Sequence, residues 1–311
     1  MARGYIMAKK FALVVAVCLG AAASLAAQAA APAQRSQAGR VSAVQRAVLA
    51  PTDTDIYCAG FFTQRSIEPG LFVLSSEDGA LKSEFADRDR IYLSKGRKGL
   101  NAPGGQYMLV RPIKDMVPVE LFPGQHAMVS RLGTLYAEIA RIQVQILHEG
   151  SATAQILTSC EPVMAGDIAI PLSARPVPPY REAKYTDHFA PSSGKPSGVI
   201  AAVKEFQQSA GTGQIVYLNV GKKQGAQAGS YLRIFRSYSS GSQDIIRYGI
   251  KNYPTEIIGV PEGHKLTPEE LKSLPRTVLG EIMILSVEDE SSTGIITYSY
   301  QDVYVGDEVD I

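Results

Sequence analysis

Three glycines at four-residue intervals form the most suggestive chemical spacing in the chain. Gly221, Gly225 and Gly229 could cradle a phosphate, because glycine lets backbone N–H groups approach an anion closely. The run lacks the Gly-Lys-Ser/Thr ending of a nucleotide-binding loop, and a related run earlier in the chain keeps only the outer two glycines, Gly96 and Gly104. We therefore interpret these glycines as residues of tight turns.

Histidines and serines show no arrangement typical of a metal site or a nucleophile. The histidines are scattered without metal-ligand spacing, at His126, His148, His188 and His264. Ser159 and Ser299 occupy equivalent places in two related segments, but neither lies in a Gly-x-Ser-x-Gly elbow and no histidine recurs with them. The sequence therefore predicts no catalytic residue, no metal ligand and no cofactor.

Two aspartates recur in the related segments, each after a glycine. Asp167 follows Gly166, and Asp307 follows Gly306. One carboxylate in each segment is not the carboxylate pair that acid–base hydrolysis uses. We predict that each Gly-Asp forms a turn in which the carboxylate accepts local backbone N–H groups, with calcium binding or catalysis as the alternatives.

Basic residues recur as well, and they are the predicted binding surface. A basic pair follows the first glycine of each related run, and an arginine lies at the end of the following strand. One interpretation is that these residues are solvated turn residues or have a structural role. The other is that they form a contact patch for an acidic protein or an anionic glycan. The set comprises Arg97, Lys98, Arg111, Lys222, Lys223 and Arg236.

These recurring residues belong to an internal duplication. Residues 92–111 match residues 217–236 at six of twenty positions, and residues 151–170 match residues 291–310 at seven of twenty. Chance alone would give about one or two matches in each comparison. The sequence therefore predicts two tandem copies of one module.

The elements that must position these residues are mostly short strands. Apolar runs of about five residues alternate with glycine turns, and they lie at residues 90–93, 107–111, 142–147, 154–157, 214–218, 231–236, 281–285 and 294–298. This pattern predicts a mainly β fold of two tandem small β-barrel-like modules. A short helix is expected in the insertion of the second module, where Thr267-Pro268-Glu269-Glu270 has a helix-start pattern. The Ser- and Gly-rich residues 237–247 are expected to form a mobile loop.

The composition divides the chain into five parts. Residues 1–31 resemble a secretory signal peptide, with Met1 or Met7 as the start, and residues 32–52 a tether with a short helix around Val41–Leu49. The first β module is predicted at 53–172 and the second at 198–311, joined by a Pro- and Ser-rich linker at 173–197. The resulting expectation is an exported protein of the periplasm, the outer envelope or the extracellular space, without a stable transmembrane span once the signal is cleaved.

Charge gives no reason to expect a nucleic-acid partner. The full chain has a formal net charge of +1, and removal of the three cations of the signal leaves −2. Such a balance offers no strong electrostatic attraction to phosphates or anionic lipid.

The second copy of the repeat resembles a known envelope module. The run from Tyr217 to Gly229, together with Leu279-Gly280-Glu281-Ile282 and the closing Gly306-Asp307, is similar to the C-terminal domain of flagellar assembly protein T. Similar segments occur in bacterial envelope proteins, some of them fused to LysM peptidoglycan-binding modules. The resemblance covers both modules and implies a small β-barrel-like module with an assembly or scaffolding role.

Two cysteines remain after the signal, and this map suggests how they could meet. Cys58 is expected on the first strand of module one, and Cys160 just after the 154–157 strand. First and late strands of a closed barrel are commonly neighbours, so a disulfide that staples this module is predicted. The alternative is two small buried apolar residues.

These observations lead to three functional hypotheses. The first is a non-enzymatic envelope scaffold or assembly factor that binds other envelope proteins. The second is a peptidoglycan- or glycan-binding protein, which would be favoured if the basic turns and nearby tyrosines shared one groove. The third is a secreted hydrolase, which would need a histidine and a carboxylate to converge.

Overall fold

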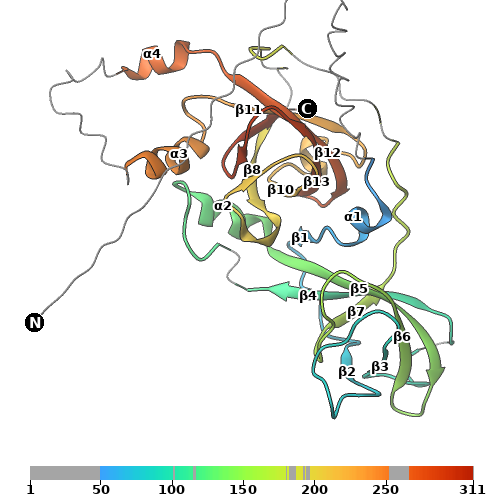
Figure 1. The fold of residues 1–311 in the computed structure, drawn as a ribbon. Coiled ribbons are helices and arrows are strands. Elements are labelled where there is room, and N and C mark those ends of the chain that lie inside the picture. Colours follow the sequence, from blue (N-terminus) through green and yellow to red (C-terminus); the bar gives the residue numbers. More distant parts are fainter. Residues whose placement is uncertain are drawn as a thin grey trace, which may run out of the picture. The chain divides into compact units, whose positions relative to one another are not determined.

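The computed structural model describes residues 50–100, 102–114, 117–179, 181, 187–191, 193, 197–251 and 266–310. The predicted signal peptide, most of the tether and the expected helix at Val41–Leu49 lie outside these residues. The described chain is mainly β, as expected from its alternating short apolar runs, with a closed six-stranded barrel, further sheets and a few short helices. Figure 1 shows the two groups of strands and the helices around them.

The first group of strands forms a strongly curved sheet. Its order is β2-β3-β6-β5-β4-β7, and all of its neighbouring strands are antiparallel. A bridge between Phe72 and Ile168 joins the two ends of this order, so the sheet meets itself and is called barrel 1. Its strands are β2 (Val73–Ser76), β3 (Arg90–Leu93), β4 (Gln106–Ile113), β5 (Thr134–Leu147), β6 (Ala152–Ser159) and β7 (Ile168–Pro171).

The second group forms the closed barrel, called barrel 2. Its order is β10-β13-β12-β11-β15-β8. Its strands are β8 (Ser197–Val203), β10 (Ile215–Leu218), β11 (Tyr231–Arg236), β12 (Thr277–Val287), β13 (Ser292–Ser299) and β15 (Glu308–Asp310). A small side sheet pairs β9 (Ser209–Ala210) with β14 (Val303–Tyr304).

The two strand orders correspond one to one. Reading each barrel from its first strand, β2-β3-β6-β5-β4-β7 matches β8-β10-β13-β12-β11-β15. The main-chain bonds that tie the first strand to the last also match, since Gly166 N–H donates to Val73 O and Gly306 N–H donates to Ile200 O. Each of the eight strands expected from the apolar runs is present, although β5 begins well before the expected residue 142.

The helices agree with the sequence in one place and differ in another. Helix α4 (Pro268–Ser273) begins as expected. The Thr267 hydroxyl accepts a hydrogen bond from the Glu270 N–H, and the Glu270 carboxylate accepts one from the Thr267 N–H. Residues 237–247, expected as a mobile loop, instead lead into helix α3 (Ser242–Lys251). The serines there have partners, because the Ser237 and Ser240 hydroxyls donate to Glu308.

Four further short helical segments, none of them predicted from the sequence, complete the described chain. Helix α1 (Asp53–Tyr57) is capped by Thr52, and α2 (Gln125–Leu132) lies between β4 and β5. Two single-turn 3₁₀ segments, η1 (Lys204–Phe206) and η2 (Lys222–Gln224), follow β8 and β10.

Apolar side chains form a core in each barrel and two more clusters that both barrels share. One shared cluster joins Ile56, Tyr136 and Ile168 to Met283 and Ile295. The other joins Phe62 and Leu135 to Ala201 and Tyr217. The barrels therefore pack on one another through buried apolar surface within the described chain.

The chain segment that follows α1 and includes β1 (Phe61–Thr63) is central to this packing. On one side, β1 pairs with β5 of barrel 1. On the other side, four of the segment's carbonyl oxygens accept hydrogen bonds from barrel 2 side chains. We call residues 58–63 the junction segment.

Candidate functional site

Each barrel contains the same buried arginine–aspartate pair. In barrel 1, Arg111 on β4 donates from Nε and Nη2 to the two carboxylate oxygens of Asp167, at 2.7 and 2.9 Å. In barrel 2, Arg236 on β11 makes the same two bonds to Asp307, both at 2.7 Å. Such two-point contacts are strong because both partners are charged and their planar geometries match.

The aspartates also organise the turn before the last strand. Asp167 accepts the Met164 N–H at 2.8 Å, and Asp307 accepts the Tyr304 N–H at 2.7 Å. The hydrogen bond to Asp167 raises the pKa of Arg111 above its ordinary value, which keeps the guanidinium charged. The two recurring arginines therefore hold the β4 and β11 strands to these turns, and the aspartates have the turn role that the sequence predicted.

The basic turns are paired with acidic residues of an adjacent hairpin. Lys98 lies 3.6 Å from Glu149, and Lys223 pairs with Glu290. Hydrogen bonding with each other raises the pKa of Lys223, which is exposed, and lowers the pKa of Glu290, whose side chain is partly buried. The same hairpins accept backbone N–H groups from Arg97, Lys222 and Lys223. Each basic turn thus contacts the hairpin of its own barrel, and none of the six predicted basic residues lines the main hollows of the described chain.

The glycines of these runs have two different roles. Gly104 and Gly229 have positive φ angles of +92° and +83°, as expected for turns, and so do Gly166 and Gly306. Gly96 and Gly221 were also interpreted as residues of tight turns, but neither has a positive φ. They are glycines because a Cβ would lie 2.2 Å from His148 O in barrel 1 and 2.4 Å from Asp289 O in barrel 2.

The other candidate reactive groups are engaged locally. Ser159 donates its hydroxyl to Asp87, and the Ser299 hydroxyl lies 3.4 Å from that of Thr212. His126 contacts Val117 O and His148 contacts Thr153, while His264 lies outside the described residues. Across the part of the chain that the structure describes, no group of three His, Cys, Asp or Glu residues could hold a metal ion.

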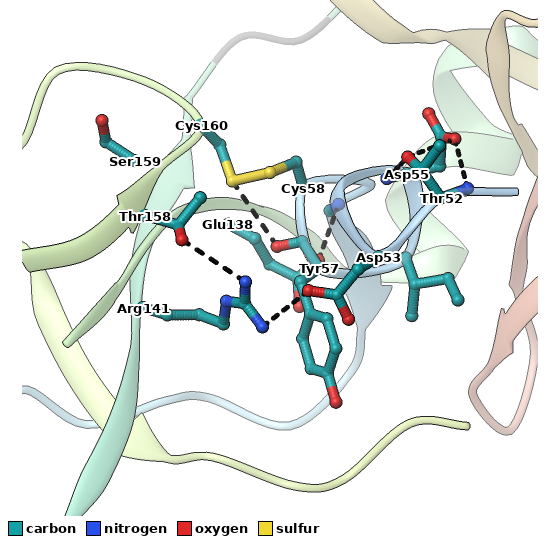
Figure 2. Close-up of a disulfide and its surroundings, with 12 residues drawn as sticks. Thr52, Asp53, Asp55, Tyr57, Cys58, Glu138, Arg141, Thr158, Ser159 and Cys160 are labelled. Atoms are coloured by element: carbon teal, nitrogen blue, oxygen red, sulfur yellow. Dashed lines mark hydrogen bonds and ion pairs between the residues drawn. A yellow bond between two sulfur atoms is a disulfide. The ribbon is translucent and has the colours of Figure 1, made fainter. Parts of the chain in front are cut away.

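The cysteines form the predicted disulfide, but its position differs from the one expected. Cys58 and Cys160 are bridged, with their Cα atoms 5.5 Å apart. Cys58 caps helix α1 rather than lying on a first strand, and Cys160 directly follows β6. Figure 2 shows the bridge joining the α1 end to the β6 end, beside Glu138 and Arg141 of β5.

In each barrel, one arginine of the linker forms an ion pair with one buried glutamate. Arg175 lies 2.5 Å from Glu138 on β5, and Arg181 lies 2.6 Å from Glu281 on β12. Burial raises the pKa of Glu138, and the charge of Arg175 opposes that rise. Sequence reasoning assigned neither glutamate a partner. Glu138 lies on the part of β5 that was not predicted, and Glu281, although on a predicted strand, is 100 residues from Arg181. The linker is therefore attached to both barrels.

An apolar groove beside the junction segment is the most distinctive surface feature. A hollow of about 210 Å³ is lined mainly by residues 117–125, the end of β8 and Phe206. A second hollow of about 130 Å³ shares Phe206 and reaches Cys58, Glu138 and Glu161. We call these two hollows together the Phe206 groove.

The backbone presents Phe206 to solvent in an unusual way. Glu205 and Phe206 are consecutive non-glycine residues with φ angles of +63° and +61°. Backbone in this region costs of order 1–3 kcal/mol per residue. Phe206 nevertheless remains 57% exposed, and Val119 across the groove is 67% exposed. A left-handed pair cannot be read from residue types alone, which is why the sequence did not predict this site.

Three tyrosines of barrel 2 offer no sugar-stacking surface beside its basic turn, because Tyr217 is buried and Tyr298 and Tyr300 lie elsewhere. Lys223 contacts the hairpin that precedes β13, whereas Tyr298 and Tyr300 lie at the far end of that strand. A strand advances about 3.3 Å per residue, so the eight-residue β13 separates the two groups by roughly 25 Å. The shared groove that would have favoured glycan binding is therefore not formed by these residues.

Comparison of the chain with protein-family models and with curated proteins gave no match. Among the described residues, no helix has the length and apolar character required to cross a membrane.

Proposed function

We propose that this protein is an exported, non-enzymatic scaffold or assembly factor of the bacterial envelope that binds a partner protein through the Phe206 groove. The observation that carries the proposal is the exposed phenyl ring of Phe206, held on a left-handed residue pair over an apolar hollow. A strained backbone that exposes an aromatic ring is costly, and such strain is concentrated at functional sites. Aromatic anchors in pockets are also typical of protein interfaces.

The occupant that fits this groove is an extended, apolar polypeptide segment with a basic side chain. One end of the groove is lined by apolar residues such as Val117, Leu121 and Val203. The other end carries Glu161 and Glu205 beside Lys204, whose ammonium donates to Cys58 O, while the charge of Glu138 is matched by Arg175. The second hollow is also lined by Cys58, Ala59 and Gly60 of the junction segment, so the groove borders the packed junction of the two barrels.

The remaining sequence features support an envelope role. A disulfide suits an oxidising compartment, as expected for an exported chain. The duplicated arginine–aspartate pairs and basic turns stabilise the barrels locally, so they leave the groove as the main candidate for recognition. The resemblance to the C-terminal domain of flagellar assembly protein T points to the same assembly or scaffolding role.

Site-specific photocrosslinking in the native host tests this proposal. A photoreactive residue at Gln207, in the groove, is compared with one at Leu81, which is 88% exposed in barrel 1. We expect one envelope protein to be captured from position 207 and not from position 81, through an apolar segment with a basic residue. Equal capture from both positions, or no capture from position 207, would contradict the proposal.

A pelleting assay with purified sacculi separates the glycan-binding alternative from the protein-binding one. The proposal expects the mature protein to stay in the supernatant when its protein partner is absent. Sedimentation with sacculi that is unaffected by changes at Phe206 would instead favour direct peptidoglycan binding.

A further inference from the structure

The disulfide lies at the base of the segment that joins the two barrels. Cys58 is the first residue of the junction segment, and Cys160 anchors it to the end of β6 in barrel 1. The bridge therefore anchors a segment of barrel 1 whose residues also contact the second barrel.

Four carbonyl oxygens of the junction segment accept hydrogen bonds from barrel 2. Lys204 Nζ donates to Cys58 O at 2.7 Å, and the Tyr217 hydroxyl donates to Ala59 O at 2.8 Å. The other two bonds, both from β13, are Thr293 Oγ1 to Gly60 O at 2.9 Å and Ser291 Oγ to Phe62 O at 3.1 Å. The first acceptor belongs to the disulfide cysteine itself.

Few main-chain contacts hold this segment to barrel 1. Strand β1 has only three residues, and its pairing with β5 is a side branch of the sheet. Gly60 N–H donates to the buried Glu138 carboxylate at 3.1 Å. Such a short strand gains little from its own ladder, so a covalent anchor contributes a large part of its order.

We propose that the Cys58–Cys160 disulfide is a redox latch of the barrel–barrel junction. When the bridge is intact, the junction segment is fixed to barrel 1 and presents its carbonyl groups to barrel 2. When the bridge is reduced, the segment loosens and the contact between the barrels weakens, while the strand core of barrel 1 stays folded.

The reaction is ordinary thiol–disulfide exchange with a dithiol reductant. Cys58 is only 9% exposed, whereas Cys160 is partly exposed, so we expect attack at Cys160 Sγ. A reductant thiolate bonds to that sulfur and displaces the Cys58 thiolate, which is then protonated. The second reductant thiol resolves the mixed disulfide and releases the Cys160 thiol, and the dithiol is oxidised by two electrons.

Amide hydrogen exchange of the mature protein tests the latch. Exchange is followed by mass spectrometry in the oxidised protein, in the dithiol-reduced protein and in the variant Cys58→Ser/Cys160→Ser. We expect peptides covering β1 to exchange at least tenfold faster in the two states that lack the bridge. Peptides covering β3, whose apolar residues belong only to the barrel 1 core, should change less than twofold.

Two results would overturn the latch. Equal acceleration in β1 and β3 would mean that the bridge simply stabilises barrel 1 as a whole. Unchanged exchange in β1 would mean that the junction does not depend on the bridge. The variant Ser291→Ala/Thr293→Val, with the disulfide intact, is the positive control for loss of the junction contacts. It removes two of the barrel 2 donors, so exchange in β1 should also accelerate.

Discussion

At the scale of single residues, the described barrels rely on charged pairs that are buried from solvent. Asp307 is fully buried and Arg236 has a side chain only 13% exposed, while the barrel 1 pair has exposures of 2% for Asp167 and 26% for Arg111. A buried carboxylate that loses its partner still carries the cost of its removal from water. Truncating one member therefore lowers the free energy of unfolding by more than the intact pair contributes to it.

The variant Arg236→Lys should destabilise the protein more than Arg111→Lys. Lysine cannot reproduce the two-point contact with the carboxylate. Because the barrel 2 pair is less exposed, fewer water molecules can supply the lost hydrogen bond there. We expect a loss of about 2 kcal/mol for Arg236→Lys and about 1 kcal/mol for Arg111→Lys in the free energy of unfolding. The chain has no tryptophan, so urea unfolding followed by circular dichroism is the measurement. Equal losses would show that exposure does not control the value of the pair.

The variant Arg175→Met should reveal the buried charge of Glu138. We expect it to lose roughly 3 kcal/mol of stability at pH 8, because the carboxylate remains buried without its cation. The companion variant Arg175→Met/Glu138→Gln should recover much of that loss, since it removes both charges.

The same variant should show a distinctive pH dependence. Losing Arg175 raises the pKa of Glu138 further, so the folded state takes up a proton at a pH where the unfolded state does not. The stability gap between Arg175→Met and the wild type should therefore narrow as the pH falls from 8 toward the unfolded value near 4.3 and level off below it. Urea unfolding at several pH values would check this, and a stability gap from the wild type that does not change with pH would contradict it.

At the scale of elements, each barrel depends on a glycine that lets a turn lie against a hairpin. Gly221 begins the η2 turn, and the following N–H groups of Lys222 and Lys223 donate to Glu288 O and Asp289 O. This close approach leaves no space for a side chain. The hairpin backbone cannot easily withdraw, because it is also the connection between β12 and β13.

The variant Gly221→Ala should lose about 2 kcal/mol of unfolding free energy through the clash with the hairpin. Gly225 is the matched control, because its φ is +87° and a Cβ would meet no atom within 4 Å. The control variant Gly225→Asn should lose less than about 1 kcal/mol, since asparagine tolerates the left-handed conformation. Thermal and urea unfolding of both variants would distinguish crowding from backbone strain, and a larger loss for Gly225→Asn would contradict this assignment.

At the scale of the whole described molecule, the two barrels are joined by buried side-chain bonds. Ser291 and Thr293 are nearly inaccessible to solvent, and both donate to the junction segment. Their acceptors would be left buried and unpaired if the hydroxyls were removed, at a cost of about 1–3 kcal/mol for each group.

The variant Ser291→Ala/Thr293→Val should therefore uncouple the barrels. We expect the urea transition to broaden or to separate into two steps, because each barrel then unfolds with less dependence on the other. The matched control Thr297→Val removes a hydroxyl bond that lies within barrel 2, so it should keep one transition. A single sharp transition in the junction variant would contradict the coupling.

Much of the architecture could be predicted from the sequence, and particular residues show where prediction ended. The alternating runs at 214–218 and 231–236 and the capping pattern at Thr267 correspond to observed elements, because local periodicity and capping decide them. The matching pairs Arg111–Asp167 and Arg236–Asp307 were visible as repeated residues but not as partners, since 56 and 71 residues separate them in the chain. The Phe206 groove was missed because it depends on backbone angles and on packing between distant segments.

The most direct test of the central claim is the affinity of the purified protein for the segment captured from position 207. A synthetic peptide of that segment would be titrated against the wild type and against Phe206→Ser, with Leu81→Ser as the matched exposed control. We predict binding by the wild type and by Leu81→Ser, and at least tenfold weaker binding by Phe206→Ser. Equal affinity for all three proteins would contradict recognition through the Phe206 groove.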